Sequence, residues 1–389
     1  MENTKVLISG ASIGGPALAY WLKRYGFDVT IVEVTDGLRA GGQAIDVRGP
    51  ALEVAERMGV LNRIREERVE MRGMSMVDGD GKELYRSEEH TITSGDLDSP
   101  DIEILRDDLS RILADAAGDG VEYLFGDSIA ALEQDDDGVH VTFRSGTTRT
   151  FDLVVGADGA HSNTRRLVFG PEERFISHLG TYLGVWTAPN FLGLDRWQVF
   201  HQMPGSSWGG GVMSVRGNEE VRVYLGFESE QPIDYDYRDF AAQKKILADA
   251  LEGGGWELPR LLDTMWDAPD FHFDSMAQIH MDSWSEGRVV LLGDAGYCGS
   301  PLSGQGTSMA MVGAYVLAGE LKAADGDHRA AFAGYERELR GYVAANQQLA
   351  LTNKARVDAQ RDAQMGVETE VVDFQDFGEI VNAFTVKDY

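Results

Sequence analysis

Two patterns of hydrophobic positions alternate along the chain and predict two different sheets. Continuous apolar runs rich in β-branched residues are typical of strands buried in a parallel sheet. Four such runs occupy residues 5–9, 28–33, 152–156 and 288–292. Alternating apolar and polar residues, typical of antiparallel strands with one buried face, occupy residues 182–186, 197–201 and 222–227. We therefore predict an α/β fold with a parallel and an antiparallel sheet.

Apolar residues at helical spacing follow several of these runs. They predict helices over residues 16–24, 106–116 and 309–321, and a long helix over residues 330–361. The long helix is rich in helix-forming residues and has the length to bridge two domains. The last residues, 367–389, are predicted to form a shorter helix or a packed tail.

The first predicted strand runs into a glycine-rich turn. In a dinucleotide-binding βαβ unit, one glycine permits the tight turn and a later one lets the helix pack on the strand. Gly10 and Gly15 stand at these positions, and Glu33 ends the second strand, where an acidic residue binds a ribose. Ser12 replaces the middle glycine, and serine is the smallest replacement that keeps a donor. This segment alone fits NAD, NADP, FAD or an ordinary βαβ unit.

Two later strand ends and one helix start extend the pattern. They contribute Asp158 and Gly159, Gly293 and Asp294, and Pro301, Gly304 and Gly306. Backbone N–H groups at a helix start can stabilise negative charge on a reduced flavin ring. The Asp294 carboxylate can accept hydrogen bonds from ribityl hydroxyl groups. Each segment alone could be a simple turn, but their order and spacing together indicate a flavin site.

With these motifs the chain resembles the group A flavoprotein monooxygenases, single-component FAD enzymes that include p-hydroxybenzoate hydroxylase. Its length and architecture are most similar to the tetracycline-inactivating flavin monooxygenases and their actinobacterial relatives. The resemblance extends from Thr4 to about Arg361. It implies a GR2-type, Rossmann-like FAD-binding domain with an inserted antiparallel-sheet substrate domain and a long C-terminal bridging helix.

The resemblance also implies domain boundaries and further contacts to FAD. The expected parts are the FAD-binding domain at residues 1–171 and 281–325, the substrate domain at 172–280 and the C-terminal helical segment at 326–389. Arg106 stands where the family has a helix that contacts FAD, and Arg39 and Asp46 stand at other cofactor contacts. Two positions depart from the family: Tyr297, usually histidine, and Gly313, often acidic. Neither is expected to abolish FAD binding.

The same resemblance implies a reaction. NADPH or NADH would reduce FAD, O2 would add at flavin C4a, and the hydroperoxide would insert one oxygen atom into an aromatic or polycyclic small molecule. A polyketide such as a tetracycline would suit such a site, so antibiotic modification is an expected role. The chemistry resides in the cofactor, so no side chain is assigned a catalytic role. An FAD-dependent oxidase or dehydrogenase without oxygenation, and a non-catalytic flavin- or ligand-binding protein, remain as alternatives.

The central region is expected to bind the substrate. Five of the seven tryptophans lie there, and aromatic residues on a sheet more often form core than contact a ligand. A sheet that presents aromatic residues would nevertheless suit a flat apolar substrate. Four residues stand near substrate contacts of the tetracycline-inactivating relatives: Arg196, Gln202, Met203 and Tyr224.

Composition narrows the possible functions. The chain has 64 acidic and 35 basic residues and a net charge of −29, which disfavours binding to nucleic acid. The single cysteine, Cys298, excludes an intrachain disulfide and a zinc cluster and suits a reducing compartment, and no metal site is predicted. There is no apolar stretch of about 18 residues and no signal peptide before the first strand. We expect a cytoplasmic monomer or homodimer without a membrane span.

Overall fold

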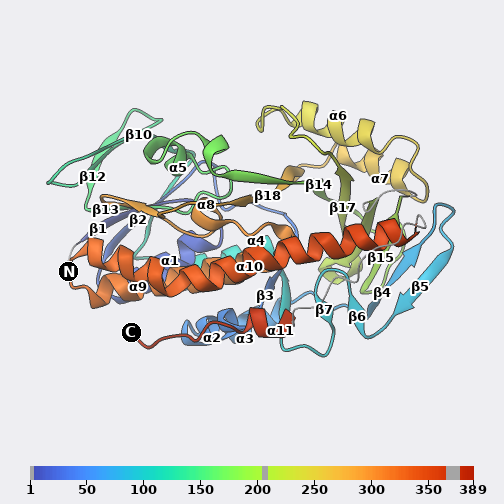
Figure 1. Cartoon of the computed structure of the whole chain (residues 1–389), viewed down its shortest axis with the longest axis horizontal. Coiled ribbons are helices and arrows are strands. Elements are labelled where there is room, and N and C mark those ends of the chain that lie inside the picture. Colours follow the sequence, from blue (N-terminus) through green and yellow to red (C-terminus); the bar gives the residue numbers. More distant parts are fainter. Residues whose placement is uncertain (1–3, 204–208, 365–376) are drawn as a thin grey trace.

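The computed structural model describes residues 4–203, 209–364 and 377–389 (Figure 1). A six-stranded sheet forms one half, in the order β19-β20-β13-β1-β2-β9. Its strands are β1 (Lys5–Ser9), β2 (Asp28–Glu33), β9 (Glu122–Phe125), β13 (Leu153–Gly156), β19 (Ser285–Glu286) and β20 (Val289–Leu291). All neighbours pair in parallel except β19 with β20, so the predicted parallel sheet is confirmed.

Both faces of this sheet are covered, which explains the continuous apolar runs. Val6 and Ile8 of β1 pack among helices, whereas Leu7 points to the opposite side and packs on a small antiparallel sheet. The helices are α1 (Gly14–Arg24), α4 (Arg106–Ala117) and α9 (Gly306–Ala323). The small sheet consists of β10 (Ile129–Gln134), β11 (Val139–Phe143) and β12 (Thr148–Phe151).

A seven-stranded sheet forms the other half, in the order β18-β14-β17-β16-β15-β4-β5. Its strands are β14 (Ile176–Pro189), β15 (Trp197–Gln202), β16 (Gly209–Val215), β17 (Glu220–Glu228), β18 (His272–Ile279), β4 (Gly73–Val77) and β5 (Glu83–Ser87). Alternate residues such as Val223 and Leu225 pack on α6 (Phe240–Ala250) and α7 (Leu258–Met265), which cover one face. The predicted antiparallel sheet is confirmed, apart from one parallel pair, β15 with β4.

This sheet extends beyond the expected substrate domain. Strands β4 and β5 come from residues 73–87, which the sequence-based division placed in the FAD-binding domain. They belong to the second sheet because Gly73–Val77 pairs with the edge strand β15, in register from Trp197 to His201. The chain therefore enters the second sheet before it reaches residue 172.

A long helix, α10 (His328–Gln364), runs along both halves (Figure 1). Asp327 caps its start, where the backbone N–H groups of Arg329 and Ala330 donate to the Asp327 carboxylate. Tyr335 donates to the carbonyl of Leu291 in the first sheet, and Gln347 donates to that of Ile279 in the second. The predicted bridging helix is thus confirmed.

The remaining elements are short. They are β3 (Ala44–Val47) paired with β8 (Ile102–Leu105), β6 (His90–Thr91) paired with β7 (Gly95–Asp96), α2 (Pro50–Arg57), α3 (Leu61–Glu66), α5 (Asn163–Val168), α8 (Asp294–Tyr297) and α11 (Phe377–Val381). In the parts of the chain that the structure describes, no helix combines the length and the apolar character needed to cross a membrane.

Candidate active site

A cavity of about 2180 Å³ joins the two halves of the molecule. The strand ends of the first sheet line one side, and the face of the second sheet that α6 and α7 leave open lines another. Helix α10 contributes Leu349, Thr352 and Asn353 to the wall. The cavity thus collects residues from every part of the fold.

The glycine-rich turn lies at the first strand end. A Cβ atom on Gly10 would lie 2.3 Å from the carbonyl oxygen of Ala157, and one on Gly15 would lie 2.0 Å from that of Gly10. Both positions therefore require glycine. Gly10 and Ser12 line the cavity, whereas Gly15 is buried behind them in α1.

Glu33 faces this turn from the end of β2. Its Oε2 accepts a hydrogen bond from the N–H of Ala11 at 2.8 Å, and its Oε1 accepts from the hydroxyl of Thr35 at 3.0 Å. The carboxylate lines the cavity and keeps further lone pairs for a hydroxyl donor. This position suits the expected ribose contact.

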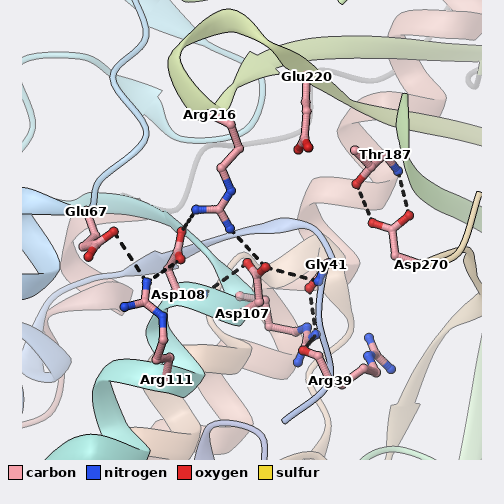
Figure 2. Close-up of polar contacts among 12 residues, drawn as sticks. Arg39, Gly41, Glu67, Asp107, Asp108, Arg111, Thr187, Arg216, Glu220 and Asp270 are labelled. Atoms are coloured by element: carbon pink, nitrogen blue, oxygen red, sulfur yellow. Dashed lines mark hydrogen bonds and ion pairs between the residues drawn. The ribbon is translucent and has the colours of Figure 1, made fainter. Parts of the chain in front are cut away.

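A loop after β2 carries Arg39 into the cavity wall (Figure 2). Arg106, at the start of α4, holds this loop by donating to the carbonyl oxygens of Arg39 at 2.8 Å and Gly41 at 2.7 Å. Asp107 accepts from the N–H of Gly41 at 3.2 Å, and Arg216 of the second sheet bonds to Asp107 at 3.0 Å. The loop is therefore held by both halves.

Arg106 is suited to an anionic ligand. Burial, reinforced by the charge of Arg39, lowers the pKa of Arg106 to about 10. Its Nε lines a buried site without a hydrogen-bond partner among the described residues. A cation that lacks full compensation is stabilised by a phosphate group, so the pair of arginines fits the pyrophosphate of a dinucleotide.

Asp158 organises the second motif. Its carboxylate accepts hydrogen bonds from the N–H and the hydroxyl of Thr164, from the hydroxyl of Ser162 and, at 3.3 Å, from that of Ser9. Gly159 follows with a φ of +81°. Both residues line the cavity, but the carboxylate of Asp158 mainly ties this turn to β1 and α5.

The third motif follows β20, next to the second motif at the strand ends of the first sheet. Gly293, Asp294, Pro301, Gly304 and Gly306 all line the cavity. Burial raises the pKa of Asp294. Gln305, between the last two glycines, is fully buried in the wall, and neither its Oε1 nor its Nε2 has a hydrogen-bond partner within the described protein. Unsatisfied buried amide groups are costly, so this wall fits a bound polar ring system such as a flavin.

The two departures from the family pattern lie behind this wall and fit each other. The Tyr297 hydroxyl forms a hydrogen bond of 2.8 Å with that of Tyr335. A Cβ atom on Gly313 would lie 2.3 Å from the Tyr297 oxygen. Glycine at 313 thus makes room for tyrosine at 297, and neither residue lines the cavity.

The open face of the second sheet forms an apolar wall. Its lining side chains include Met74, Met76, Leu183, Val185, Phe200 and Tyr224. The Phe200 ring lies over Gly211, because a Cβ atom there would be 2.3 Å from Cδ1 of Phe200. A ring that lies flat against the sheet leaves a broad slot above it.

Of the four residues suggested as substrate contacts, Tyr224 lines the cavity. Arg196 is half exposed at the turn before β15, where it pairs with Glu70 at 3.6 Å. Met203 packs against the core under α6 and α7, on the other face of the sheet. Gln202 pairs with Gly209 through its backbone, and its side chain lies outside the described structure.

The tryptophans of this region form core or surface. Trp186 and Trp197 are buried in the sheet, and Trp266 is 49% exposed. Trp208 lies outside the described residues. None of the described tryptophans lines the cavity, so apolar contacts there come from methionine, leucine, valine and phenylalanine.

Several polar residues of the cavity were not predicted, among them His161, Asp274, His272 and Arg48. Asp274 and Glu172 each accept a hydrogen bond from the His161 ring, at 3.0 and 2.8 Å, and together raise its pKa to about 10. Burial, followed by the charge of Arg39, lowers the pKa of His272 to about 4. Arg48 also lines the cavity. These side chains come from separate loops and strands, so no local sequence signal marks them.

Comparisons with known proteins agree with this site. The family described as FAD binding domain matches residues 3–346. A flavin-dependent monooxygenase of Legionella longbeachae is 42% identical over 346 residues, covering 89% of this chain and 87% of the relative. An uncharacterized protein of Mycobacterium tuberculosis is 52% identical over 384 residues, 99% of each chain. The crystal structure of the tetracycline destructase Tet(51) superimposes with a TM-score of 0.87 at 36% identity, covering all of both chains.

The family match covers most of the chain and includes all three cofactor motifs. The relatives match at an identity and coverage at which fold and cofactor are shared. FAD is therefore the cofactor of this protein. The chain belongs to the family of FAD-dependent monooxygenases.

Proposed function

We propose that the protein uses NADPH or NADH to reduce FAD and inserts one atom of O2 into an aromatic or polycyclic small molecule. The observation that carries this proposal is the continuity of the cavity, with cofactor motifs at one end and an apolar sheet face at the other. A pocket for one drug-sized ligand has about 300–1,000 Å³. The cavity of about 2180 Å³ therefore has room for a dinucleotide and a second molecule.

The cofactor would be held by groups that line the cavity at the strand ends of the first sheet and beside them. Glu33 would accept from a ribose hydroxyl, Arg39 and Arg106 would pair with the pyrophosphate, and Asp294 would accept from the ribityl chain. The N-terminus of α9 at Gly306 would face the flavin ring. When bound and reduced, FAD supplies the activation of O2 and the transfer of oxygen, and the side chains bind, orient and exclude water.

The substrate would lie on the open face of the second sheet. Phe200, Leu183 and Val185 offer an apolar surface, and Met74 and Met76 are flexible thioethers that adapt to irregular shapes. A flat fused-ring molecule buries more apolar area on such a wall than a chain of the same size. A tetracycline-like polyketide fits this description, and the similarity to a tetracycline destructase supports it.

The reductant would approach at the rim. His161 is stacked with Tyr237 at 6.1 Å between ring centres, and the Arg238 guanidinium lies 4.8 Å above the Tyr237 ring. All three residues line the cavity, and Tyr237 is 54% exposed. An exposed ring beside cationic groups suits a molecule with aromatic bases and phosphates.

Oxidation of NADPH and NADH by the FAD-loaded protein tests the proposal. Phenols, fused-ring phenols and tetracyclines should be compared, with products followed by mass spectrometry. We expect one compound class to stimulate oxidation and to gain the mass of one oxygen atom. Substrate oxidation without NAD(P)H would instead identify an oxidase, and FAD binding without any turnover would identify a binding protein.

A further inference from the structure

Two carboxylic acids lie side by side next to the cavity. Asp46 of β3 and Glu103 of β8 stand directly opposite each other in the antiparallel pairing of these strands. Residues in this relation point to the same face, with Cβ atoms about 4.5–5.5 Å apart. Asp46 is 8% exposed and Glu103 is 6% exposed, and Asp46 lines the cavity.

Arg48 is the cation next to three carboxylic acids: Asp46, Asp101 and Glu103. Arg48 Nη2 lies 3.0 Å from Asp46 Oδ2, and Arg48 Nε lies 3.4 Å from Asp101 Oδ2. If Asp46, Asp101 and Glu103 were all ionised, two negative charges would remain uncompensated away from water. Adjacent carboxylates in such a site share a proton, because both cannot ionise at low cost.

Burial shifts the ionisation of both acids to higher pH. Burial raises the pKa of Asp46 to about 7 even though Arg48 opposes it. Burial and the negative charge of Asp46 raise the pKa of Glu103 to about 8. Near neutral pH, the pair as a unit therefore still holds a proton.

Asp46 lines the cavity, and its partner Arg48 reaches the turn that is expected to face the flavin ring. Asp46 Oδ1 and Glu103 Oε2 have no hydrogen-bond partner within the described protein. Arg48, which holds the other Asp46 oxygen, reaches the turn at residues 301–306, where its Nη1 would be 3.5 Å from a Cβ atom on Gly304. Its N–H also donates to Ser308 of α9 at 3.1 Å.

From this geometry we propose that Asp46 is a catalytic base that takes a proton from a phenolic or enolic hydroxyl group of the bound substrate. Glu103 is a positioning residue that keeps the pair singly protonated. This inference rests on the monooxygenase function proposed above.

The proton step balances within the site. The substrate O–H bond breaks, a new O–H bond forms at Asp46 Oδ1, and the electron pair stays on the substrate oxygen. The resulting oxyanion raises the electron density of the substrate ring. The ring then reacts faster with an electrophilic oxygen atom. The proton returns to the product oxyanion before release. A base is most effective when its pKa lies near the working pH, and an ordinary aspartic acid at about 3.9 is too weak.

Few other titratable groups face the pair. Arg48 and Asp101 adjoin Asp46 on one side, and Tyr224 of β17 lies on the other. The Tyr224 oxygen accepts from the N–H of Ala44 at 2.9 Å and donates to Met213 Sδ at 3.4 Å, and burial raises its pKa. Burial also raises the pKa of Asp101, so the Asp101→Asn variant is needed to separate this third acid from the pair.

An infrared titration of the FAD-loaded protein tests the shared proton without turnover. The difference in the protonated-carboxyl C=O band between wild type and Asp46→Asn, and between wild type and Glu103→Gln, should be followed from about pH 5 to 9. We expect wild type to lose intensity in two steps, near pH 7 and pH 8. Glu103→Gln and Asp46→Asn should each leave a single step, because only one acid of the coupled pair remains. Absence of protonated carboxyl signal from the pair at neutral pH would overturn the proposal.

The pH dependence of kcat for substrate-stimulated NAD(P)H oxidation tests the role of the base. Wild type should lose activity below about pH 7. We expect Asp46→Asn to lower kcat about 100-fold and to abolish this acid limb, and Asp46→Glu to restore part of both. Asp101→Asn, which removes the third acid but leaves the pair, should retain the limb.

Two outcomes separate this inference from the proposed function. The Asp46→Asn variant could keep both the rate of substrate-stimulated NAD(P)H oxidation and the loss of activity at low pH. That result would disprove the role of Asp46 as a base and would leave the monooxygenase function standing. If the wild-type protein showed no substrate-stimulated NAD(P)H oxidation, both the proposed function and the role of Asp46 would be disproved. In that case the infrared titration still decides whether the pair shares a proton.

Discussion

The hydroxyl of Tyr297 occupies the place where a side chain at position 313 would lie. Its partner Tyr335 also donates to the carbonyl of Leu291. The two phenols therefore join α10 to the first sheet, behind the cavity wall at residues 293–306. This contact requires a glycine in the middle of a buried helix, where glycine costs about 1 kcal/mol relative to alanine. The packing around Tyr297 offsets that cost.

We expect Gly313→Ala to lower the free energy of unfolding by about 1–3 kcal/mol, because the added methyl group overlaps the Tyr297 oxygen. Tyr297→Phe in the same chain should recover most of the loss, which urea denaturation of both variants would measure. Gly341→Ala is the matched control. Gly341 lies in α10 with no atom within 4 Å of its added Cβ, so this change should stabilise by about 0.5–1 kcal/mol. If both glycine substitutions changed the free energy of unfolding equally, the close contact between position 313 and Tyr297 would not explain the loss.

Arg106 is expected to determine much of the affinity for FAD. Arg106→Lys removes the planar fork that holds the Arg39 and Gly41 carbonyl oxygens, and we expect Kd for FAD to rise about 10- to 100-fold. Quenching of FAD fluorescence on binding measures it. Arg111→Lys provides the control, since Arg111 lies further along α4 and pairs with Asp108 and Glu67 (Figure 2). A rise of similar size in the control would show that helix stability alone is responsible.

The sequence indicates the residues whose roles are local. Gly10 and Gly15 are recognisable because a tight turn and a close helix approach need glycine at fixed spacing. Asp46 is also recognisable as a cavity residue through the family resemblance. Its neighbour Glu103 is not, because the two meet only through the pairing of β3 with β8, across more than fifty intervening residues.

At the scale of elements, His161 connects the loop before α5 with strand β18 of the second sheet. Both ring nitrogens face carboxylates, so the imidazole is held in its charged form. The folded pKa of about 10 lies above the unfolded value of about 6.5. The stabilising contribution of His161 is therefore complete below about pH 6.5 and is lost as the pH rises through about 10.

We expect the difference in unfolding free energy between wild type and His161→Gln to shrink steadily from pH 6 to pH 10. Denaturant unfolding at several pH values measures it. His140→Gln serves as control, because His140 is exposed on β11 and bonds to one carboxylate, so its loss should cost less than about 0.5 kcal/mol. If the difference in unfolding free energy between wild type and His161→Gln stayed constant with pH, the assignment of a charged His161 between two carboxylates would be wrong.

Elements are predictable where their signal is periodic. The parallel strands, α4, α9 and α10 all follow from apolar spacing, and α10 begins two residues before the predicted start because Asp327 caps it. The position of Met203 was not predictable in the same way. Met203 directly follows β15, where a step of one residue moves a side chain to the other face of the sheet, and the sequence alone does not say which face is open.

For the whole molecule, the fold class and cofactor follow from combining motifs that are far apart in sequence. What the sequence does not contain is the size of the cavity or the share that each half contributes. Those depend on how α10 and two sheets pack together, and no local pattern encodes them. For this reason, the apolar wall on the open face of the second sheet is the least predictable part of the cavity.

The pairing of β4 with β15 also limits how such enzymes can recombine. A chimera that exchanged residues 172–280 alone would match a foreign β15 to the native hairpin at residues 73–87. The new strand would have to fit the old one in length, twist and register, or the sheet would end in an unpaired edge. The second sheet is therefore encoded by two separate pieces of gene, and a graft that keeps the sheet intact must transplant both.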